Sequence, residues 1–307
     1  MSRLIFISTS TFGEFDQTPL QELKKKKYEV VLNDHRRKLS EEEVVRLAKG
    51  AIGLIAGTEN LTSEVLQRLA PTLKVISRCG VGMDNVNQKK AEELNIKVLS
   101  TKRAPTRAVA ELTVGLIFDV VRRISEMDRD IRNGRFEKKM GSILRGKNLG
   151  IIGYGEIGKE VREICRGLVA DIKFYDPALK NQQFKEDYLE LDQLLKESDI
   201  ISLHVPYTKE THHMIGADQL KLMKSESYLI NTSRGGIVDE MALYRALKDK
   251  KIAGAALDVF EEEPYAGPFK ELDNCILTPH IGSYAKEARI QMETEAVQNL
   301  IKALGDH

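Results

Sequence analysis

The chain has 307 residues, of which 42% are hydrophobic and 30% charged, and it contains no tryptophan. This composition is typical of a globular protein and excludes a fibrous or largely disordered chain. With 47 basic and 46 acidic residues the formal net charge is +1, so no overall field favours nucleic acid or a membrane surface.

The first hundred residues alternate short apolar runs with amphipathic segments. Strands are expected at 4–8, 28–33, 51–57, 73–77 and 96–100, with helical patterns in most of the gaps. Ser40 and Glu43 have the spacing of a capping box, which predicts the start of a helix. Short, uninterrupted apolar strands separated by helices predict a parallel sheet covered on both faces.

A long helical pattern follows Pro105 and runs from residue 106 to residue 134. It begins apolar and becomes strongly charged, so we expect its first half to be buried and its second half to be exposed or in a partner contact. A second alternating series places strands at 148–153, 171–176, 199–205, 228–233, 252–259 and 275–280, and a final helix at about 283–305. Two such series joined by one helix predict an α/β fold with two doubly wound parallel-sheet domains.

The three cysteines, Cys79, Cys165 and Cys275, form no C-x-x-C motif, which favours a reducing compartment over a disulfide framework. The N-terminal stretch MSRLIFISTS has only four consecutive apolar residues, too few for the core of a signal peptide. No window approaches the ~20 apolar residues that cross a bilayer. We therefore expect a cytoplasmic location, and we interpret Cys79 as structural.

The segment LGIIGYGEIGKEV contains a glycine loop of the form G-x-G-x-x-G, made by Gly153, Gly155 and Gly158 between an apolar strand and a helical pattern. Asp176 ends the next predicted strand, as in the dinucleotide-binding fingerprint. Gly153 permits a tight turn, Gly155 lets the backbone approach a pyrophosphate, and Gly158 allows close helix–strand packing. The Asp176 carboxylate can accept hydrogen bonds from both ribose hydroxyls and would repel a 2′-phosphate, so NAD is expected rather than NADP.

Arg234, Glu263 and His280 each follow a predicted strand of the domain that carries the glycine loop. The carboxyl ends of parallel strands are where open α/β sheets bind ligands. A guanidinium matches a carboxylate through two parallel hydrogen bonds. Histidine, with a reference pKa of about 6.5, suits proton transfer near neutral pH, and a neighbouring carboxylate orients the ring and stabilises its protonated form. The three residues therefore suit hydride transfer to a 2-oxoacid, which also needs a proton for the carbonyl oxygen.

Further motifs accompany the glycine loop: SRCGVGMDNV (77–86), AVAEL (108–112), HVPYTKETHHMI (204–215), INTSRGGIVDE (230–240), LDVFEEEP (257–264) and TPHIGSYA (278–285). In order and spacing the chain resembles the D-isomer-specific 2-hydroxyacid dehydrogenase family, and within it is most similar to short D-3-phosphoglycerate dehydrogenases without a regulatory domain. The resemblance implies an NAD-binding Rossmann-type domain, residues 103–284, inserted into a flavodoxin-like substrate-binding domain, residues 1–102 plus 285–307. It also implies a homodimer formed largely through the cofactor domain.

Carried over by position, the resemblance implies that Arg234 binds the substrate carboxylate, that Glu263 pairs with the histidine, and that His280 is the acid/base. It implies a substrate-binding loop made of Arg78, Cys79, Gly80, Val81 and Gly82. The residues expected at the cofactor are Gly153, Tyr154, Gly155, Glu156, Ile157, Gly158, Asp176, His204, Val205, Pro206, Thr211, Thr232, Ser233, Asp258 and Gly282. No metal site is expected, because no third ligand at zinc-like spacing accompanies His212 and His213.

Three positions depart from the resemblance. Phosphoglycerate enzymes tend to have an arginine where this chain has Gly57 and Thr58, and the usual Thr-Pro before the long helix is Thr101-Lys102. Glu156 stands where many relatives have arginine. Arg78, Lys102 and Arg103 remain a hypothetical phosphate site, while Arg107 suits a surface position as well as a substrate contact.

The activity that the resemblance implies is an NAD-dependent interconversion of a D-2-hydroxyacid and its 2-oxoacid, of the D-3-phosphoglycerate dehydrogenase kind. An alternative is a glyoxylate/hydroxypyruvate reductase or another D-2-hydroxyacid dehydrogenase. Formate dehydrogenase is a further rival, but formate oxidation has no hydroxyl proton to remove, so Glu263 beside His280 argues against it. A non-catalytic NAD-sensing regulator is the alternative from another class of protein.

Overall fold

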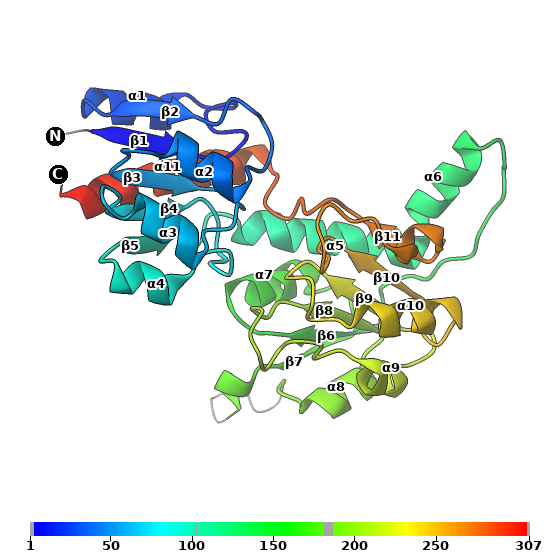
Figure 1. The fold of residues 1–307 in the computed structure, drawn as a ribbon. Coiled ribbons are helices and arrows are strands. Elements are labelled where there is room, and N and C mark those ends of the chain that lie inside the picture. Colours follow the sequence, from blue (N-terminus) through cyan, green and yellow to red (C-terminus); the bar gives the residue numbers. More distant parts are fainter. Residues whose placement is uncertain (1–2, 102, 181–186, 306–307) are drawn as a thin grey trace. The chain divides into compact units, whose positions relative to one another are not determined.

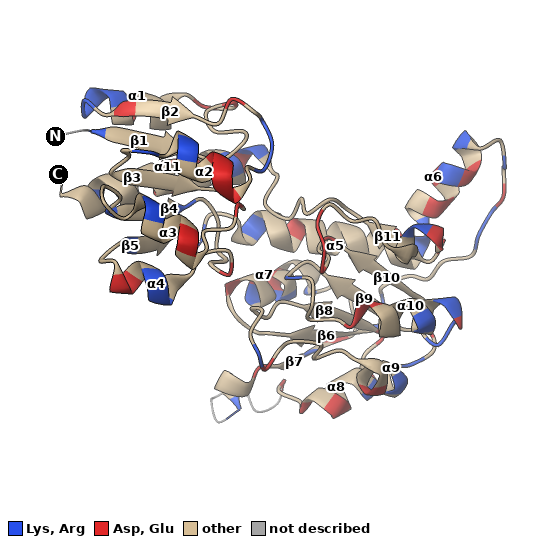
Figure 2. Ribbon diagram, viewed as in Figure 1, with Lys and Arg blue, Asp and Glu red and all other residues tan. Residues whose placement is uncertain are grey.

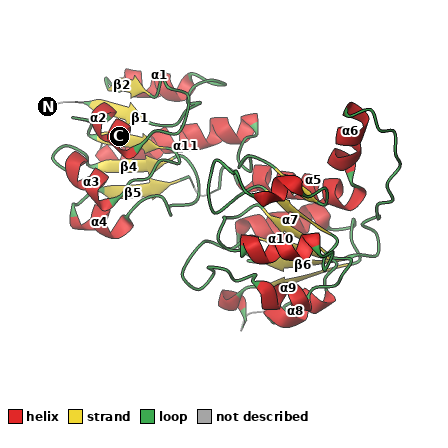
Figure 3. Cartoon of the chain, turned by 45° about the vertical axis from the view of Figure 1, so that its right-hand side comes forward, coloured by secondary structure: helices red, strands yellow, loops and turns green. Residues whose placement is uncertain are grey.

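The computed structural model describes residues 3–101, 103–180 and 187–305, and the chain divides into two compact units. Unit 1 is discontinuous and consists of Met1–Pro105 and Ser283–His307, whereas unit 2 is the continuous stretch Thr106–Gly282. Both units combine parallel strands with helices (Figures 1 and 3). Lys102, which belongs to the phosphate-site hypothesis, lies outside the described residues.

Unit 1 contains a five-stranded parallel sheet in the order β2-β1-β3-β4-β5, which is the flavodoxin-like order. The strands are β1 (Leu4–Ile7), β2 (Glu29–Leu32), β3 (Gly53–Ala56), β4 (Val75–Arg78) and β5 (Lys97–Ser100). The helices are α1 (Thr18–Lys25), α2 (Glu41–Leu47), α3 (Ser63–Leu69), α4 (Gln88–Glu93) and α11 (Lys286–Leu304). Ser40 caps α2 with the predicted capping box.

Alternate strand residues of unit 1 enter two apolar clusters, as the period of two requires when both faces of a sheet are covered. Leu54 and Ile76 pack with residues of α2, α3 and α4, whereas Ile55 packs with residues of α1 and α11. An added Cβ on Gly53 would lie 2.9 Å from Leu300 Cδ1, so α11 lies directly against β3. The last helix of the chain therefore completes the core of the unit that begins it.

Unit 2 contains a six-stranded parallel sheet in the order β11-β10-β9-β8-β6-β7. The strands are β6 (Asn148–Ile152), β7 (Asp171–Tyr175), β8 (Ile200–Leu203), β9 (Tyr228–Asn231), β10 (Gly254–Leu257) and β11 (Cys275–Leu277). The α-helices are α5 (Thr106–Arg122), α6 (Ile124–Arg132), α7 (Glu156–Cys165), α8 (Leu191–Glu197), α9 (Ala217–Leu222) and α10 (Glu240–Lys248). Two short 3-10 turns are η1 (Pro177–Leu179) and η2 (Pro268–Glu271).

The sheet of unit 2 is also covered on both faces. Ile201 and Leu229 pack with residues of α8, α9 and α10, and the alternate residues Ile200 and Ile230 pack with residues of α5 and α7. The strand order reverses between β6 and β8, which makes their carboxyl ends the topological switch point where such sheets bind ligands. The two doubly wound parallel-sheet domains predicted from the sequence are confirmed, and each predicted strand is present in the described residues.

The prediction of one continuous helix over 106–134 is wrong. The chain forms α5 and α6 with a break at Arg123, whose φ of 56° lies in the left-handed region. Asp119 accepts the backbone N–H of Ser125 at 2.7 Å and also its hydroxyl, which stabilises the new direction of the chain. The apolar-to-charged pattern continues across Arg123, so periodicity alone does not reveal the break.

Within the described residues, no helix is long and apolar enough to cross a bilayer. Figure 2 shows the strands of both sheets almost entirely in the colour of uncharged residues, while basic and acidic residues of both signs lie on the helices and loops. This distribution matches two cores that each bury a sheet between helices.

Candidate active site

Arg234, Glu263 and His280 follow three strands that are neighbours in the sheet of unit 2. Arg234 comes after β9, Glu263 after β10 and His280 after β11, and the sheet order places β10 between the other two. Because parallel strands end at the same edge, these residues lie on three adjacent loops. The structure thus brings the sequence-predicted residues of the unit to one edge.

His280 and Glu263 are in direct contact. The imidazole Nδ1 lies 2.8 Å from Glu263 Oε2 and 3.1 Å from Oε1. The side chains are 39% and 38% exposed, so the pair is accessible to a small molecule. With Nδ1 bound to the carboxylate, Nε2 is the ring nitrogen left to face a reacting oxygen.

The turn that carries His280 is built around the buried carboxylate of Asp258. Asp258 accepts the Thr278 hydroxyl at 2.6 Å and the backbone N–H groups of Ile281 and Gly282 at 2.8 Å each. His280 itself has a φ of 54°, a left-handed conformation that costs energy for a residue with a Cβ. Burial raises the pKa of Asp258, although its three donors act in the opposite direction.

The loop that carries Arg234 is organised by Asn231 at the end of β9. The Asn231 amide donates to the Arg234 carbonyl at 2.8 Å, and its oxygen accepts the backbone N–H of Ser233 at 3.0 Å and the Ser233 hydroxyl at 2.7 Å. An added Cβ on Gly235 would lie 2.0 Å from the Phe260 carbonyl oxygen, so only glycine fits there. This close approach joins the arginine loop to the loop that carries Glu263, within which the Phe260 N–H donates to Glu263 at 3.2 Å.

The glycine loop follows β6 at the switch point. Gly153 has a φ of +91°, and an added Cβ on Gly158 would lie 2.2 Å from the Gly153 carbonyl oxygen, so both positions require glycine. A Cβ on Gly155 would meet nothing within 4 Å, which leaves room for a ligand at the N-terminus of the ten-residue helix α7. Asp176 accepts the Tyr154 N–H at 2.9 Å and therefore lies against the loop. These features fit a dinucleotide.

Two residues expected at the cofactor direct their side chains inward. The Tyr154 ring stacks on Phe174 with centroids 4.0 Å apart, and its hydroxyl accepts from Arg162 at 2.9 Å. His204 bonds to Ser202 at 2.8 Å, and burial lowers its pKa to about 3, which keeps the ring neutral. These inward-facing side chains support the glycine loop. The sequence did not reveal Arg162 as one of the supports, because its partners Tyr154 and Asp187 lie outside its own helix.

The remaining residues expected at the cofactor lie beside the switch point or on the histidine and arginine loops. An added Cβ on Gly153 would lie 2.5 Å from the His204 carbonyl oxygen, so the turn of Val205 and Pro206 begins next to the glycine loop. Thr211 donates to the Pro206 carbonyl at 2.7 Å and closes this turn. Thr232 shares a 2.8 Å hydrogen bond with Thr113 of α5, a residue that sequence reasoning missed.

Several other residues named in the sequence analysis have structural or surface environments. Burial raises the pKa of Cys79 to about 11, which suits a structural and unreactive thiol. Arg107 pairs with Glu111 and Glu160 at 2.6 Å each and is a surface residue at the start of α5. The described residues contain no cluster of metal-ligating side chains.

In unit 1, the loops after β3 and β4 begin at the carboxyl edge of its sheet. Gly80 has a φ of +152°, donates to the Thr101 hydroxyl at 2.8 Å and accepts the Thr101 N–H at 3.1 Å. Arg78 donates to the Cys79 carbonyl next to it. After β3, the buried Glu59 carboxylate accepts the Gly57 N–H at 3.1 Å and the Ser8 hydroxyl.

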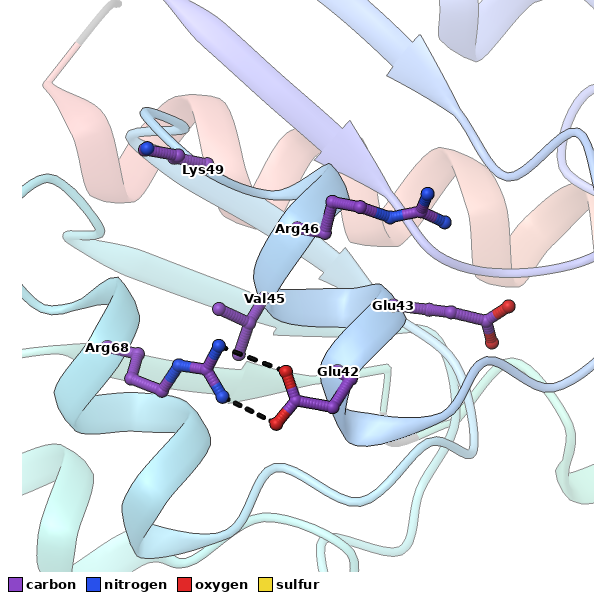
Figure 4. Close-up of a pocket in the computed structure, with 6 residues that line it drawn as sticks. All are labelled: Glu42, Glu43, Val45, Arg46, Lys49 and Arg68. Atoms are coloured by element: carbon purple, nitrogen blue, oxygen red, sulfur yellow. Dashed lines mark hydrogen bonds and ion pairs between the residues drawn. The ribbon is translucent and has the colours of Figure 1, made fainter.

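A surface hollow on α2 and α3 contains none of the candidate residues. Figure 4 shows Arg68 and Glu42 forming a two-point ion pair at its rim, with contacts of 2.6 and 3.0 Å. It is lined by Glu42, Glu43, Val45, Arg46, Lys49 and Arg68. Exposed ion pairs of this kind are ordinary surface features and contribute little to stability.

The switch-point glycine loop, its acidic partner and a carboxylate-bound histidine define a dinucleotide-binding oxidoreductase. The family model described as D-isomer specific 2-hydroxyacid dehydrogenase, NAD binding domain, matches residues 114–282. The chain belongs to this family and is an NAD-dependent oxidoreductase.

Individual relatives extend the match beyond unit 2. The chain is 44% identical over 273 residues to a glyoxylate reductase of Thermococcus litoralis, covering 84% of this chain and 81% of that protein. It is 38% identical over 277 residues to a D-3-phosphoglycerate dehydrogenase of Archaeoglobus fulgidus, covering 87% of this chain and 52% of that longer protein. A D-lactate dehydrogenase from Aquifex aeolicus, solved with NAD and lactic acid, superposes with a TM-score of 0.84 at 32% identity, covering 99% and 96% of the two chains.

Proposed function

We propose that the protein reduces a small, unphosphorylated 2-oxoacid, such as glyoxylate or hydroxypyruvate, to the D-2-hydroxyacid. The observation that carries the reaction type is the 2.8 Å contact between His280 and Glu263, on loops that adjoin the loop of Arg234. Bound NADH supplies the hydride for C2 of the substrate. His280 Nε2 gives the proton to the carbonyl oxygen, Glu263 stabilises the protonated ring beforehand, and Arg234 binds the substrate carboxylate.

We propose cofactor roles for the residues expected from the sequence, in some cases through the backbone alone. The free backbone at Gly155 and the N-terminus of α7 would hold the pyrophosphate, and Asp176 would accept the ribose hydroxyls. Tyr154 would contribute its backbone only, because its ring is buried against Phe174. The Asp258 carboxylate is already bound by three donors of the histidine turn, so we propose that it acts mainly by shaping that turn.

The choice of an unphosphorylated substrate rests on the loop after β3 in unit 1, the unit that we propose to bind substrate. This loop lies beside the switch point between β1 and β3 and presents glycine and threonine, with the Glu59 carboxylate beneath them. A buried carboxylate without an arginine in the same loop disfavours a phosphate dianion. Phosphoglycerate oxidation, the first expectation from the resemblance, is therefore the second candidate.

A substrate panel tests this proposal. With saturating NADH, we expect kcat/KM for glyoxylate or hydroxypyruvate to exceed that for 3-phosphohydroxypyruvate by at least about tenfold, because one unfavourable charge contact is worth more than ~1.4 kcal/mol. Equal efficiencies, or a preference for the phosphorylated substrate, would contradict the proposed substrate class. No turnover with any 2-oxoacid would contradict the reaction itself.

We also propose that the protein is a homodimer formed through an arm made of α6 and residues 133–143. In Figures 1 and 3, α6 stands away from the sheet of its own unit. The acidic residues Glu126 and Asp130 are buried in the arm, where Lys139 pairs with both at 2.6 Å. The large exposed apolar residues of the arm are Ile124, Ile131, Phe136, Met140 and Ile143, and Phe118 of α5 is exposed as well.

The occupant that best fits this arm is a second copy of the chain. Buried acidic residues of the arm are paired within it, whereas its large apolar residues are exposed and form a surface to cover. Dimers with a two-fold axis are the commonest homo-oligomers. Light scattering is expected to give a dimer mass for the wild type and a monomer mass for the double variant Phe136→Glu, Met140→Glu. A monomeric wild type would refute this arrangement.

The location proposed from the sequence is the cytoplasm. Cys79, Cys165 and Cys275 are free and buried, which supports a reducing compartment. Detection of the protein in a membrane or secreted fraction would contradict this location.

A further inference from the structure

The segment between β8 and α9 contacts both of the loops that carry Arg234 and Glu263. The backbone N–H of His213 donates to the Gly236 carbonyl at 2.7 Å, two residues beyond Arg234. The imidazole Nε2 of the same residue lies 2.9 Å from Glu261 Oε1, two residues before Glu263. One residue therefore connects the two loops, by its backbone on one side and its side chain on the other.

The His213 ring is held in place by its neighbours. Its φ of 50° is left-handed, and its ring stacks on that of His212 with centroids 3.9 Å apart. His212 Nδ1 in turn lies 3.1 Å from the Tyr207 hydroxyl. An added Cβ on Gly236 would lie 2.8 Å from Cε2 of Tyr207, so this tyrosine also packs on the arginine loop.

The contact between His213 and Glu261 lies in a cluster of negatively charged side chains. Glu261, Glu262 and Glu263 are consecutive, and the Glu261 N–H donates to the partly buried Glu240 at 2.7 Å. Burial and the nearby carboxylates raise the pKa of Glu240. The loop thus concentrates like charges that repel one another, and His213 supplies a hydrogen-bond donor to it from a different element.

We propose that His213 is a positioning residue that holds the loop of Arg234 and the loop of Glu263 in fixed register. It acts through Gly236 and Glu261. This inference rests on the proposed function, because it presumes that Arg234 binds the substrate carboxylate and that Glu263 supports His280.

The test is a double-mutant cycle with His213→Asn and Glu261→Gln. Asparagine tolerates the left-handed backbone but is too short to reach Glu261, so it removes the ring's contacts with Glu261 and His212 and keeps the backbone bond to Gly236. His213→Gln is the rescue variant, because its longer amide can still donate to Glu261. Glu262→Gln, an exposed residue of the same loop, is the matched control for the loss of one negative charge.

We expect each single variant to lose about fivefold in kcat/KM for the 2-oxoacid, with kcat lowered and the 2-oxoacid KM raised, because both loops are disturbed. The double variant should lose no more than either single variant. The KM for NADH and the melting temperature should stay at wild-type values, as in Glu262→Gln, and His213→Gln should recover most of the activity.

Three results would overturn the inference: wild-type kinetics in His213→Asn, losses that multiply in the double variant, or a lowered melting temperature with unchanged kcat and KM. The cycle uses whichever 2-oxoacid the wild-type enzyme reduces best, so an error in substrate class leaves it intact. Failure of the proposed reaction is distinct, since the wild type would then reduce no 2-oxoacid.

Discussion

Units 1 and 2 each bury a carboxylate beneath a turn at the carboxyl edge of their sheets. In unit 2, Asp258 binds two backbone N–H groups and a hydroxyl of the turn that carries His280. In unit 1, Glu59 binds the Gly57 N–H and the Ser8 hydroxyl. A buried carboxylate thus fixes a backbone turn in both units, but the turn in unit 2 carries an imidazole and the turn in unit 1 carries only small residues.

The comparison suggests that proton transfer depends on the turn of unit 2 and that the turn of unit 1 affects which substrate binds. In the proposed reaction, Arg234 binds the substrate and His280 transfers the proton. Both lie at the carboxyl edge of the sheet of unit 2, where Asn231, Asp258 and Glu263 hold their loops in place. The loop after β3 in unit 1 has a buried glycine, Gly57, and an exposed threonine, Thr58, which suits a contact surface. Changes at His280 and at its support Asp258 in unit 2 should therefore lower kcat, and changes in the unit 1 turn should alter only the 2-oxoacid KM.

The largest expected effect is that of His280→Ala, which removes the proposed proton donor. We expect kcat to fall by about 10³-fold, within the usual contribution of general acid catalysis, while NADH still binds. Steady-state kinetics and NADH fluorescence titration measure the two quantities. His35→Ala, an exposed histidine of unit 1, is the control, and a near wild-type rate in His280→Ala would remove the basis for the division between the units.

Arg234→Lys should lower kcat/KM for the 2-oxoacid by about 10²-fold, because a lysine cannot form two parallel hydrogen bonds with a carboxylate. The exposed Arg245→Lys of the same unit serves as the control. Unchanged kinetics in Arg234→Lys would show that the substrate carboxylate binds elsewhere.

Asp258→Asn and Glu59→Gln compare the two buried carboxylates directly. Each amide turns a donor toward backbone N–H groups, so each variant should lose about 2 kcal/mol of unfolding free energy. Urea denaturation measures this loss. Only Asp258→Asn should also lower kcat, whereas Glu59→Gln should alter the 2-oxoacid KM; the reverse pattern would contradict the comparison.

The smallest effect concerns the pH dependence of stability through His204. Its folded-state pKa is lowered from 6.5 to about 3, so the unfolded chain takes up a proton first as the pH falls. The stability that the neutral ring contributes is complete above pH 6.5 and declines toward pH 3, by about 1.4 kcal/mol at pH 5.5. The unfolding free energy, measured by denaturation at pH 7.5 and 5.5, should fall by about 1.4 kcal/mol less in His204→Gln than in the wild type. An equal fall in both proteins would show that the ring is not kept neutral by burial.

Local signals in the sequence predict most of the fold. The strands appear as apolar runs, and the glycine loop and Asp176 appear as a motif between a strand and a helix. Arg234, Glu263 and His280 could be found because each follows a strand directly. Periodicity cannot predict the left-handed break at Arg123, since the amphipathic pattern crosses it.

Support for the site depends on contacts between distant residues, and these the sequence does not reveal. Thr113 and Thr232 are 119 positions apart, and His213 and Glu261 are 48 positions apart. The inward direction of the Tyr154 ring depends on packing against Phe174 of the next strand. Such tertiary contacts leave no short motif, so the buried supports become visible only in the structure.

The placement of α11 against β3 has a consequence for synthesis of the protein. Unit 2 is continuous and has all of its strands once residue 277 has left the ribosome, so it can fold during translation. Unit 1 lacks Met292, Val297 and Leu300 from its core until the last helix emerges. One face of its sheet is therefore covered only in part, by α1, while about 180 further residues are translated, and apolar surface exposed in this way is prone to aggregation.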